Sequence, residues 1–110
     1  MPSEMRTAQL LDRLPSVVLV DALGRPYFDS AHLPGAVNIP PHQVPVLAPR
    51  LLPNRSAEIV VYGENAESAN AAIVLDRLVR LGYSNVSVYL DGTQGWIAAG
   101  LPVERRTEPD

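Results

Sequence analysis

Residues 16–39 read S-V-V-L-V-D-A-L-G-R-P-Y-F-D-S-A-H-L-P-G-A-V-N-I, and this stretch decides the fold class of the chain. Residues 16–20 form an almost continuous apolar run that is too short for a helix, so they predict a strand buried on both faces. A turn of helix is expected over residues 27–31, and a second short strand over residues 36–39. Apolar strands that alternate with helices are typical of an α/β domain, because helices cover both faces of a parallel sheet.

The same alternation continues through the rest of the chain. Residues 59–62 (I-V-V-Y) and 86–90 (V-S-V-Y-L) predict two more buried strands. Helical segments are predicted over residues 3–14, 43–52, 68–81 and 93–99. Pro45 and Pro49 are expected to interrupt the second of these helices, and Gly82 is expected to end the third in a left-handed conformation.

The third of these helices shows the clearest amphipathic pattern. Its apolar residues at helical spacing, which are expected to face the sheet, are Ala71, Leu75, Leu78 and Val79. We therefore expect a single domain over residues 1–110, built as a three-layer α/β/α sandwich around a mainly parallel sheet of about four or five strands. Residues 105–110 are expected to form a frayed polar tail.

The composition excludes several kinds of chemistry. The chain has no cysteine, which excludes thiolate catalysis, disulfide bonds and cysteine-ligated zinc. All basic residues are Arg, so Schiff-base chemistry and a phosphate-binding lysine are also excluded. The net charge of −3 argues against a nucleic-acid partner. Since no apolar run is long enough for a membrane span and no signal peptide opens the sequence, we expect a cytoplasmic protein without a membrane partner.

Two signatures in the sequence resemble those of rhodanese-like domains. In the first, an Asp closes a buried strand, a His follows eleven residues later, and an aliphatic-Pro-Gly-Ala turn leads into a strand; Asp21, His32 and Gly35 keep this pattern. The second joins I-V-V-Y, a short loop and a long helix to L-G-Y-S-N-V-S-V-Y-L-D-G-T-Q-G-W, which includes Gly92 and Trp96. The resemblance extends over about residues 16–104 and implies the rhodanese-like α/β fold.

The resemblance also implies a sulfurtransferase site, from which the essential residue is missing. Family members use one cysteine that follows the central strand and opens a loop whose backbone N–H groups hold an anion at a helix N-terminus. That thiolate takes sulfur from thiosulfate or a related donor as a persulfide and passes it to an acceptor. Gly63 stands at this position. The remainder of the loop is Glu64, Asn65, Ala66, Glu67 and Ser68, where active relatives carry at least one Arg.

A second departure concerns the cation that relatives carry shortly after the strand-closing Asp. Leu23 takes the place of that Arg, and Arg25 is the nearest residue that would reach the same space. Glu64 and Glu67 place two negative charges beside the expected anion site, which opposes anion binding by about 1–2 kcal/mol. These carboxylates also suit the positive end of the helix dipole, and they would form a partner-facing acidic surface.

The other polar residues that attract attention have simpler interpretations. Asp21 is expected to bind backbone N–H groups, and His32 to have a structural role in its turn. His42 is interpreted as an isolated surface histidine, so neither a metal site nor a cofactor is expected. Ser68 is interpreted as a helix N-cap, because no histidine stands in reach to activate it as a nucleophile. Trp96 is expected to pack in the core or at a pocket rim.

These observations leave three functional hypotheses. The first is a rhodanese-like binding or regulatory module without sulfurtransferase activity, whose loop at residues 63–68 meets a protein partner. The second is a thiosulfate or persulfide sulfurtransferase in which Gly63 is a replaced cysteine. The third is a phosphatase-like anion-binding domain, which the carboxylates of Glu64 and Glu67 disfavour. The sequence leaves the partner and the oligomeric state open.

Overall fold

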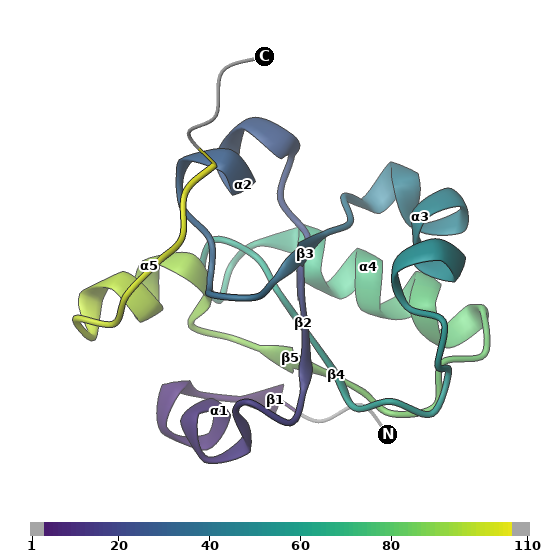
Figure 1. Ribbon diagram of the computed structural model, residues 1–110, viewed down its shortest axis with the longest axis horizontal. Coiled ribbons are helices and arrows are strands. Elements are labelled where there is room, and N and C mark those ends of the chain that lie inside the picture. Colours follow the sequence, from purple (N-terminus) through teal and green to yellow (C-terminus); the bar gives the residue numbers. More distant parts are fainter. Residues whose placement is uncertain (1–3, 107–110) are drawn as a thin grey trace.

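A computed structural model describes residues 4–106 as a five-stranded parallel sheet with helices on both faces (Figure 1). The strand order is β1-β5-β4-β2-β3. The strands are β1 (Glu4–Met5), β2 (Val18–Asp21), β3 (Val37–Asn38), β4 (Ile59–Tyr62) and β5 (Val86–Tyr89). All four neighbouring pairs are parallel. The predicted three-layer α/β architecture with a parallel sheet is therefore confirmed.

Helices on the two faces enclose two separate apolar cores. The helical segments are α1 (Thr7–Arg13), α2 (Arg25–Ser30), the 3-10 turn η1 (Pro41–Gln43), α3 (Val44–Leu51), α4 (Ala69–Arg80) and α5 (Gly92–Ala98). The helices α3 and α4 pack on one face with strand residues such as Val20 and Val61, whereas α1 and α5 pack on the other with Leu19 and Val60. Within residues 4–106, no helix is long and apolar enough to cross a membrane.

The N-terminal helix begins later than the sequence predicts. Glu4 and Met5 form the edge strand β1, which pairs with β5, and the helix α1 starts only at Thr7. Asp91 holds this start in place, because its carboxylate accepts hydrogen bonds from Arg6 Nη1 and from the backbone and hydroxyl of Thr7. Residue 3, the predicted helix start, lies outside the described residues.

The predicted inner stripe of α4 is wrong at one position. Ala71, Val74 and Leu78 are the buried residues of this helix, whereas Val79 is 46% exposed and Leu75 is half-buried. The apolar pattern of α4 is therefore wider than the face that the sheet covers. The predicted left-handed conformation at the end of this helix is confirmed, since Gly82 has a φ of +96°.

The prediction that Pro45 and Pro49 interrupt α3 is wrong. Pro45 lies in the first helical turn, where an N–H group would have no intrahelical partner, so it costs no hydrogen bond. Pro49 lies inside the helix, which nevertheless continues to Leu51. In the predicted tail, the N–H of Arg106 donates to the carbonyl of Asp29, and residues 107–110 lie outside the described range.

Candidate functional site

The candidate site lies where the carboxyl ends of the parallel strands meet. Strand β4 ends at Tyr62, and residues 63–68, called here the β4–α4 loop, connect it to α4. Ligand sites of open α/β sheets form at this end of the strands. Gly63, which directly follows β4, is buried, while Ala66 and Glu67 are exposed at the loop tip.

Ser68 fills the space beside Gly63. A Cβ atom built on Gly63 would lie 2.5 Å from the Ser68 Oγ atom and 2.9 Å from its Cβ atom. Ser68 occupies the N-cap position of α4 as predicted, but its hydroxyl makes no capping hydrogen bond. The hydroxyl instead takes up the volume that a side chain at position 63 would need.

Hydrogen bonds fasten the β4–α4 loop to the start of α5. The N–H groups of Thr93 and Gln94 donate to the carbonyl oxygens of Gly63 and Glu64 at 3.0 and 2.9 Å. The Gln94 side chain extends this contact, because its Nε2 atom donates to Glu64 Oε2 at 2.7 Å and its Oε1 atom accepts from Asn65 Nδ2 at 3.1 Å. The loop and α5 are thus joined through both backbone and side chains.

Gly92 permits this close approach of α5 to the loop. Its φ is +66°, in the left-handed region that favours glycine. A Cβ atom at this position would lie 2.5 Å from the carbonyl oxygen of Gly63 and 2.6 Å from the carbonyl carbon of Glu64. Both the conformation and the contact therefore require glycine.

The loop retains unpaired backbone donors beside its carboxylates. Asn65 orders the tip, since its side-chain oxygen accepts from Glu67 N and its carbonyl from Ser68 N. The N–H groups of Glu64, Asn65 and Ala66 make no hydrogen bond within residues 4–106. Three consecutive N–H groups at the end of a strand are what an anion site needs, but the carboxylates of Glu64 and Glu67 oppose that use.

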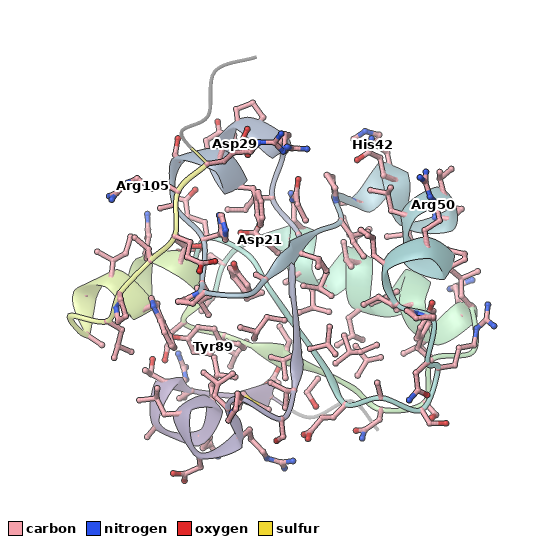
Figure 2. All side chains as sticks on the ribbon, in the orientation of Figure 1. Asp21, Asp29, His42, Arg50, Tyr89 and Arg105 are labelled. Atoms are coloured by element: carbon pink, nitrogen blue, oxygen red, sulfur yellow. The ribbon has the colours of Figure 1, made fainter. Side chains whose placement is uncertain are left out.

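Asp21 is buried at the end of β2. Its Oδ1 atom accepts the N–H of Leu23 at 2.9 Å, which ties the following loop to the strand, whereas Oδ2 has no hydrogen-bond partner among the described residues. Burial raises the pKa of the Asp21 carboxyl, and the Leu23 bond and the nearby Tyr62 hydroxyl oppose that rise. Figure 2 places Asp21 in the interior, in contrast to the peripheral His42.

His32 fastens the C-terminal segment. Its ring stacks on Phe28 with a centroid separation of 3.7 Å, and its Nδ1 atom donates to the Phe28 carbonyl at 2.7 Å. Its backbone pairs with Glu104 in an antiparallel bridge, and the Glu104 carboxylate accepts the N–H of Gly35. These contacts join the turn that contains His32 and Gly35 to the C-terminal segment at Glu104.

Two further predicted residues have defined positions. Trp96 lies in the core, with 3% exposure, where its Nε1 atom donates to the Pro102 carbonyl at 2.6 Å. Arg25 does not take over the role of the missing cation at Leu23, because its Nε atom pairs with Asp29 Oδ1 along α2 at 2.9 Å. The site therefore has no arginine from this segment.

Sequence reasoning missed Gln94 and Asp91. Gln94 lies about thirty residues from its loop partners, and Asp91 lies even farther from Arg6 and Thr7, so no local pattern links them. Thr93 is a third residue that the sequence did not indicate. It is buried, and its Oγ1 atom makes no hydrogen bond among the described residues. Within residues 4–106, no three His, Asp or Glu side chains gather to hold a metal ion.

Comparison with known proteins identifies the family. Residues 6–99 match the family described as "Rhodanese-like domain". The chain belongs to this family. No curated protein gives a significant match to the chain.

Solved structures show the same rhodanese-like fold. The solution structure of the rhodanese-like domain of Alr3790 from Anabaena sp. is 26% identical, with a TM-score of 0.83, and the match covers 100% of this chain and 87% of that one. A thiosulfate sulfurtransferase from Pseudomonas aeruginosa is 26% identical, with a TM-score of 0.81, over 94% of this chain and 20% of that chain. BH2092 from Bacillus halodurans, at 19% identity and a TM-score of 0.85 over 94% of this chain and 77% of that one, shares the fold.

Family membership makes the absence of a thiol at position 63 important for function. Sulfur transfer in the family depends on one cysteine, and this rhodanese-like domain contains no cysteine. Its β4–α4 loop, which leads from the strand to the helix, carries glycine, two glutamates and a hydroxyl. The loop offers hydrogen-bonding groups and negative charge, and it offers no nucleophile that forms a persulfide.

Proposed function

We propose that this rhodanese-like domain does not transfer sulfur and acts as a binding module whose β4–α4 loop meets a basic surface of a partner protein. The observation that carries the proposal is the pair Gly63 and Ser68. Position 63 has no side chain, and the Ser68 hydroxyl fills the space beside it. The Ser68 hydroxyl makes no hydrogen bond to a histidine within residues 4–106, so it remains protonated and cannot replace a thiolate in persulfide formation.

The charge of the loop supports a basic partner. Glu67 is exposed and makes no ion pair within the described part of the chain, and Glu64 is half-buried with its carboxylate on Gln94. The negative charges of these two carboxylates raise the free energy of a bound sulfur-containing anion and lower that of a bound cation. Exposed pairs contribute little individually, so recognition would also need packing contacts.

The fastening of the loop supports binding without turnover. Gln94 and the N-terminus of α5 hold the loop through four hydrogen bonds from or to Gly63, Glu64 and Asn65. A loop fixed in this way presents a preformed surface, so a partner does not have to order it on binding. The arrangement also leaves little room for a bulkier side chain at position 63.

A cyanide-dependent thiocyanate assay tests the absence of sulfur transfer. The purified full chain is incubated with thiosulfate and cyanide, with an active rhodanese-like domain as the positive control. We expect thiocyanate to form at the uncatalysed rate at every protein concentration. A rate of thiocyanate formation that rises in proportion to protein concentration, from an activity that co-elutes with the chain, would defeat the proposal.

A further inference from the structure

A groove beside α4 adjoins the site described above, since Asn65, Ala66 and Ser68 of the β4–α4 loop are among the residues that line it. It encloses about 660 Å³ between α4 and the edge of the sheet formed by β5 and β1. Its lining includes Val88 and Leu90 from the end of β5, Ala72 and Leu75 from α4, and Glu4 from β1. Its volume falls in the range of ordinary ligand and peptide sites.

The sequence of α4 contains a second apolar stripe, and two of its three residues, Ala72 and Leu75, line this groove. Ala71, Val74 and Leu78 are spaced to face the sheet and are buried. Ala72, Leu75 and Val79 repeat the same spacing one residue later, yet Ala72 is exposed, Leu75 half-buried and Val79 46% exposed. Helix formation requires one apolar face against the sheet, so the second face is available to another molecule.

The sheet below this helical face is also only partly covered. Glu4 pairs with Val88 in the β1–β5 register, so their side chains share one face of the sheet. The partner residues of the same strands, Met5 and Tyr89, are buried in the opposite core. Val88 remains half-buried. Because parallel sheets are normally covered on both faces, the groove marks a place where residues 4–106 provide no such cover.

The charges around the groove select a cationic occupant. Glu4 is the one charged side chain among the residues that line it, and Glu67 is exposed on the loop next to the lining residue Ala66. Both arginines of α4 are engaged elsewhere, since Arg80 pairs with Asp76 at 2.9 Å and Arg77 Nη1 donates to the Pro41 carbonyl at 2.7 Å. An occupant with negative charge would therefore be repelled, and one that combines apolar and basic side chains would be attracted.

Two other occupants fit less well. The chain's own C-terminal segment is held elsewhere, since the N–H of Arg106 donates to Asp29 at the end of α2. A second copy in a two-fold arrangement would place the same acidic patch, with Glu4 and Glu67, on both sides of the interface, and it would oppose like charges. A different protein with a basic segment avoids that repulsion.

We infer that this groove docks an amphipathic, cationic segment of another protein. Apolar side chains of the segment pack against Ala72, Leu75 and Val88, while an Arg or Lys side chain reaches Glu4. The inference rests on the proposed function, because it supplies the packing contacts that an acidic loop alone lacks. It adds a location and a partner chemistry that the loop does not specify.

A phage-displayed library of random twelve-residue peptides tests the inference. The immobilised full chain is the target, and synthetic versions of the selected peptides are measured by fluorescence anisotropy. We expect the selected sequences to combine Arg or Lys with large apolar residues. Their affinity should fall at least tenfold for Ala72→Arg, which adds bulk and positive charge at an exposed position, and about threefold for Glu4→Gln.

Matched variants control for general charge effects. Ala98→Arg changes an exposed alanine on α5, and Asp12→Asn removes an exposed carboxylate on α1, so neither should alter peptide affinity. Circular dichroism checks that all four variants are folded. Selection of acidic peptides, failure to select any peptide, or equal binding to Ala72→Arg and wild type would overturn the inference.

The outcomes separate this inference from the proposed function. If binding is lost on Glu67→Gln but not on Ala72→Arg, the loop alone recognises basic segments, and the groove proposal fails while the proposed function stands. If sedimentation equilibrium shows a dimer that Ala72→Arg dissociates, the occupant is a second copy and the inference is wrong. Thiocyanate turnover would remove the proposed function whatever the peptides do.

Discussion

The Ser68 hydroxyl oxygen lies 2.5 Å from the point where a Cβ atom on Gly63 would stand. Real Cβ atoms do not approach other heavy atoms so closely, so a side chain at position 63 requires Ser68 to rotate. Rotation of the hydroxyl would relieve only part of the contact, because the Ser68 Cβ atom lies 2.9 Å from the same point and moves only if the start of α4 shifts. The glycine at position 63 and the position of the Ser68 side chain are thus sterically coupled.

Introducing a cysteine at position 63 should not produce sulfurtransferase activity. In Gly63→Cys, the carboxylates of Glu64 and Glu67 favour the neutral thiol, so we expect a raised thiol pKa and sulfur transfer near background. In Gly63→Cys combined with Glu64→Gln and Glu67→Gln, the thiol pKa should be lower and any transfer rate higher. The rate of thiol alkylation against pH measures this difference.

The cysteine-free background gives a clean control for this experiment. Ala98→Cys places a single thiol at an exposed position of α5 and provides the reference titration. If the thiol of Gly63→Cys is already largely ionised at pH 7, the loop still stabilises an anion. Glu64 and Glu67 would then have no inhibitory role.

The contact between Gly92 and the loop predicts that alanine is much more destabilising at Gly92 than at Gly100. Gly92→Ala should destabilise the protein by about 3 kcal/mol or more, because a Cβ atom there would meet the backbone of Gly63 and Glu64 in addition to the cost of a positive φ. Gly100→Ala has a similar φ of +78° but nothing within 4 Å of the added atom, so it should cost about 1 kcal/mol. Urea unfolding measures both, and equal losses would contradict the close approach.

The side-chain hydrogen bonds of Gln94 to Glu64 and Asn65 predict that the amides of the β4–α4 loop are protected from hydrogen exchange. Gln94→Leu removes both side-chain bonds to Glu64 and Asn65, and it should cost about 1 kcal/mol of stability. We expect amide hydrogen exchange to accelerate at Thr93 and in the β4–α4 loop and to remain unchanged in β2. Gln43→Leu, at an exposed glutamine of η1, is the matched control. Unchanged exchange at Thr93 would show that the backbone bonds suffice.

The buried carboxyl of Asp21 predicts that the stability of the protein depends on pH. Its pKa is raised above the unfolded value, so between the two pKa values the folded state retains a proton that the unfolded state loses, and stability falls as pH rises. Asp21→Asn keeps an acceptor for Leu23 N–H and removes this term. The stability of the variant relative to wild type should therefore increase from pH 4.5 to pH 7.5.

Asp21→Ala separates the charge from the hydrogen bond. This variant leaves the Leu23 N–H without its acceptor and should lose about 1–3 kcal/mol at both pH values. Urea unfolding of both variants and wild type at each pH measures these terms. An advantage of Asp21→Asn that stays constant or shrinks with rising pH would contradict a raised pKa.

Short-range patterns predicted the framework of the sheet because buried strands carry their own signal. The strand at residues 59–62 is confirmed at both ends, since all four of its residues are apolar and buried. Strand β1 could not be predicted in this way. It has only two residues, with Glu4 exposed and Met5 buried, and it exists because β5 pairs with it.

The details of the site depend on contacts that a local pattern cannot contain. Ser68 was predicted as a helix N-cap from its position, and only its side-chain direction shows that it fills the space at Gly63. Gln94 reaches Glu64 across two elements of the fold. The wide apolar stripe of α4 was visible in the sequence, but the exposure of Val79 depends on which part of the sheet lies beneath the helix.

The direct test of the proposed role is an NMR titration of the β4–α4 loop. The free N–H groups of Glu64, Asn65 and Ala66 are the reporters, and the probes are thiosulfate and an octa-arginine peptide, each added to the isotope-labelled full chain at low salt. We predict that the peptide shifts these resonances, that Glu67→Gln weakens the effect, and that thiosulfate leaves them unchanged at millimolar concentration. Saturable shifts with thiosulfate and none with the peptide would show that the loop still binds anions and would contradict the proposed function.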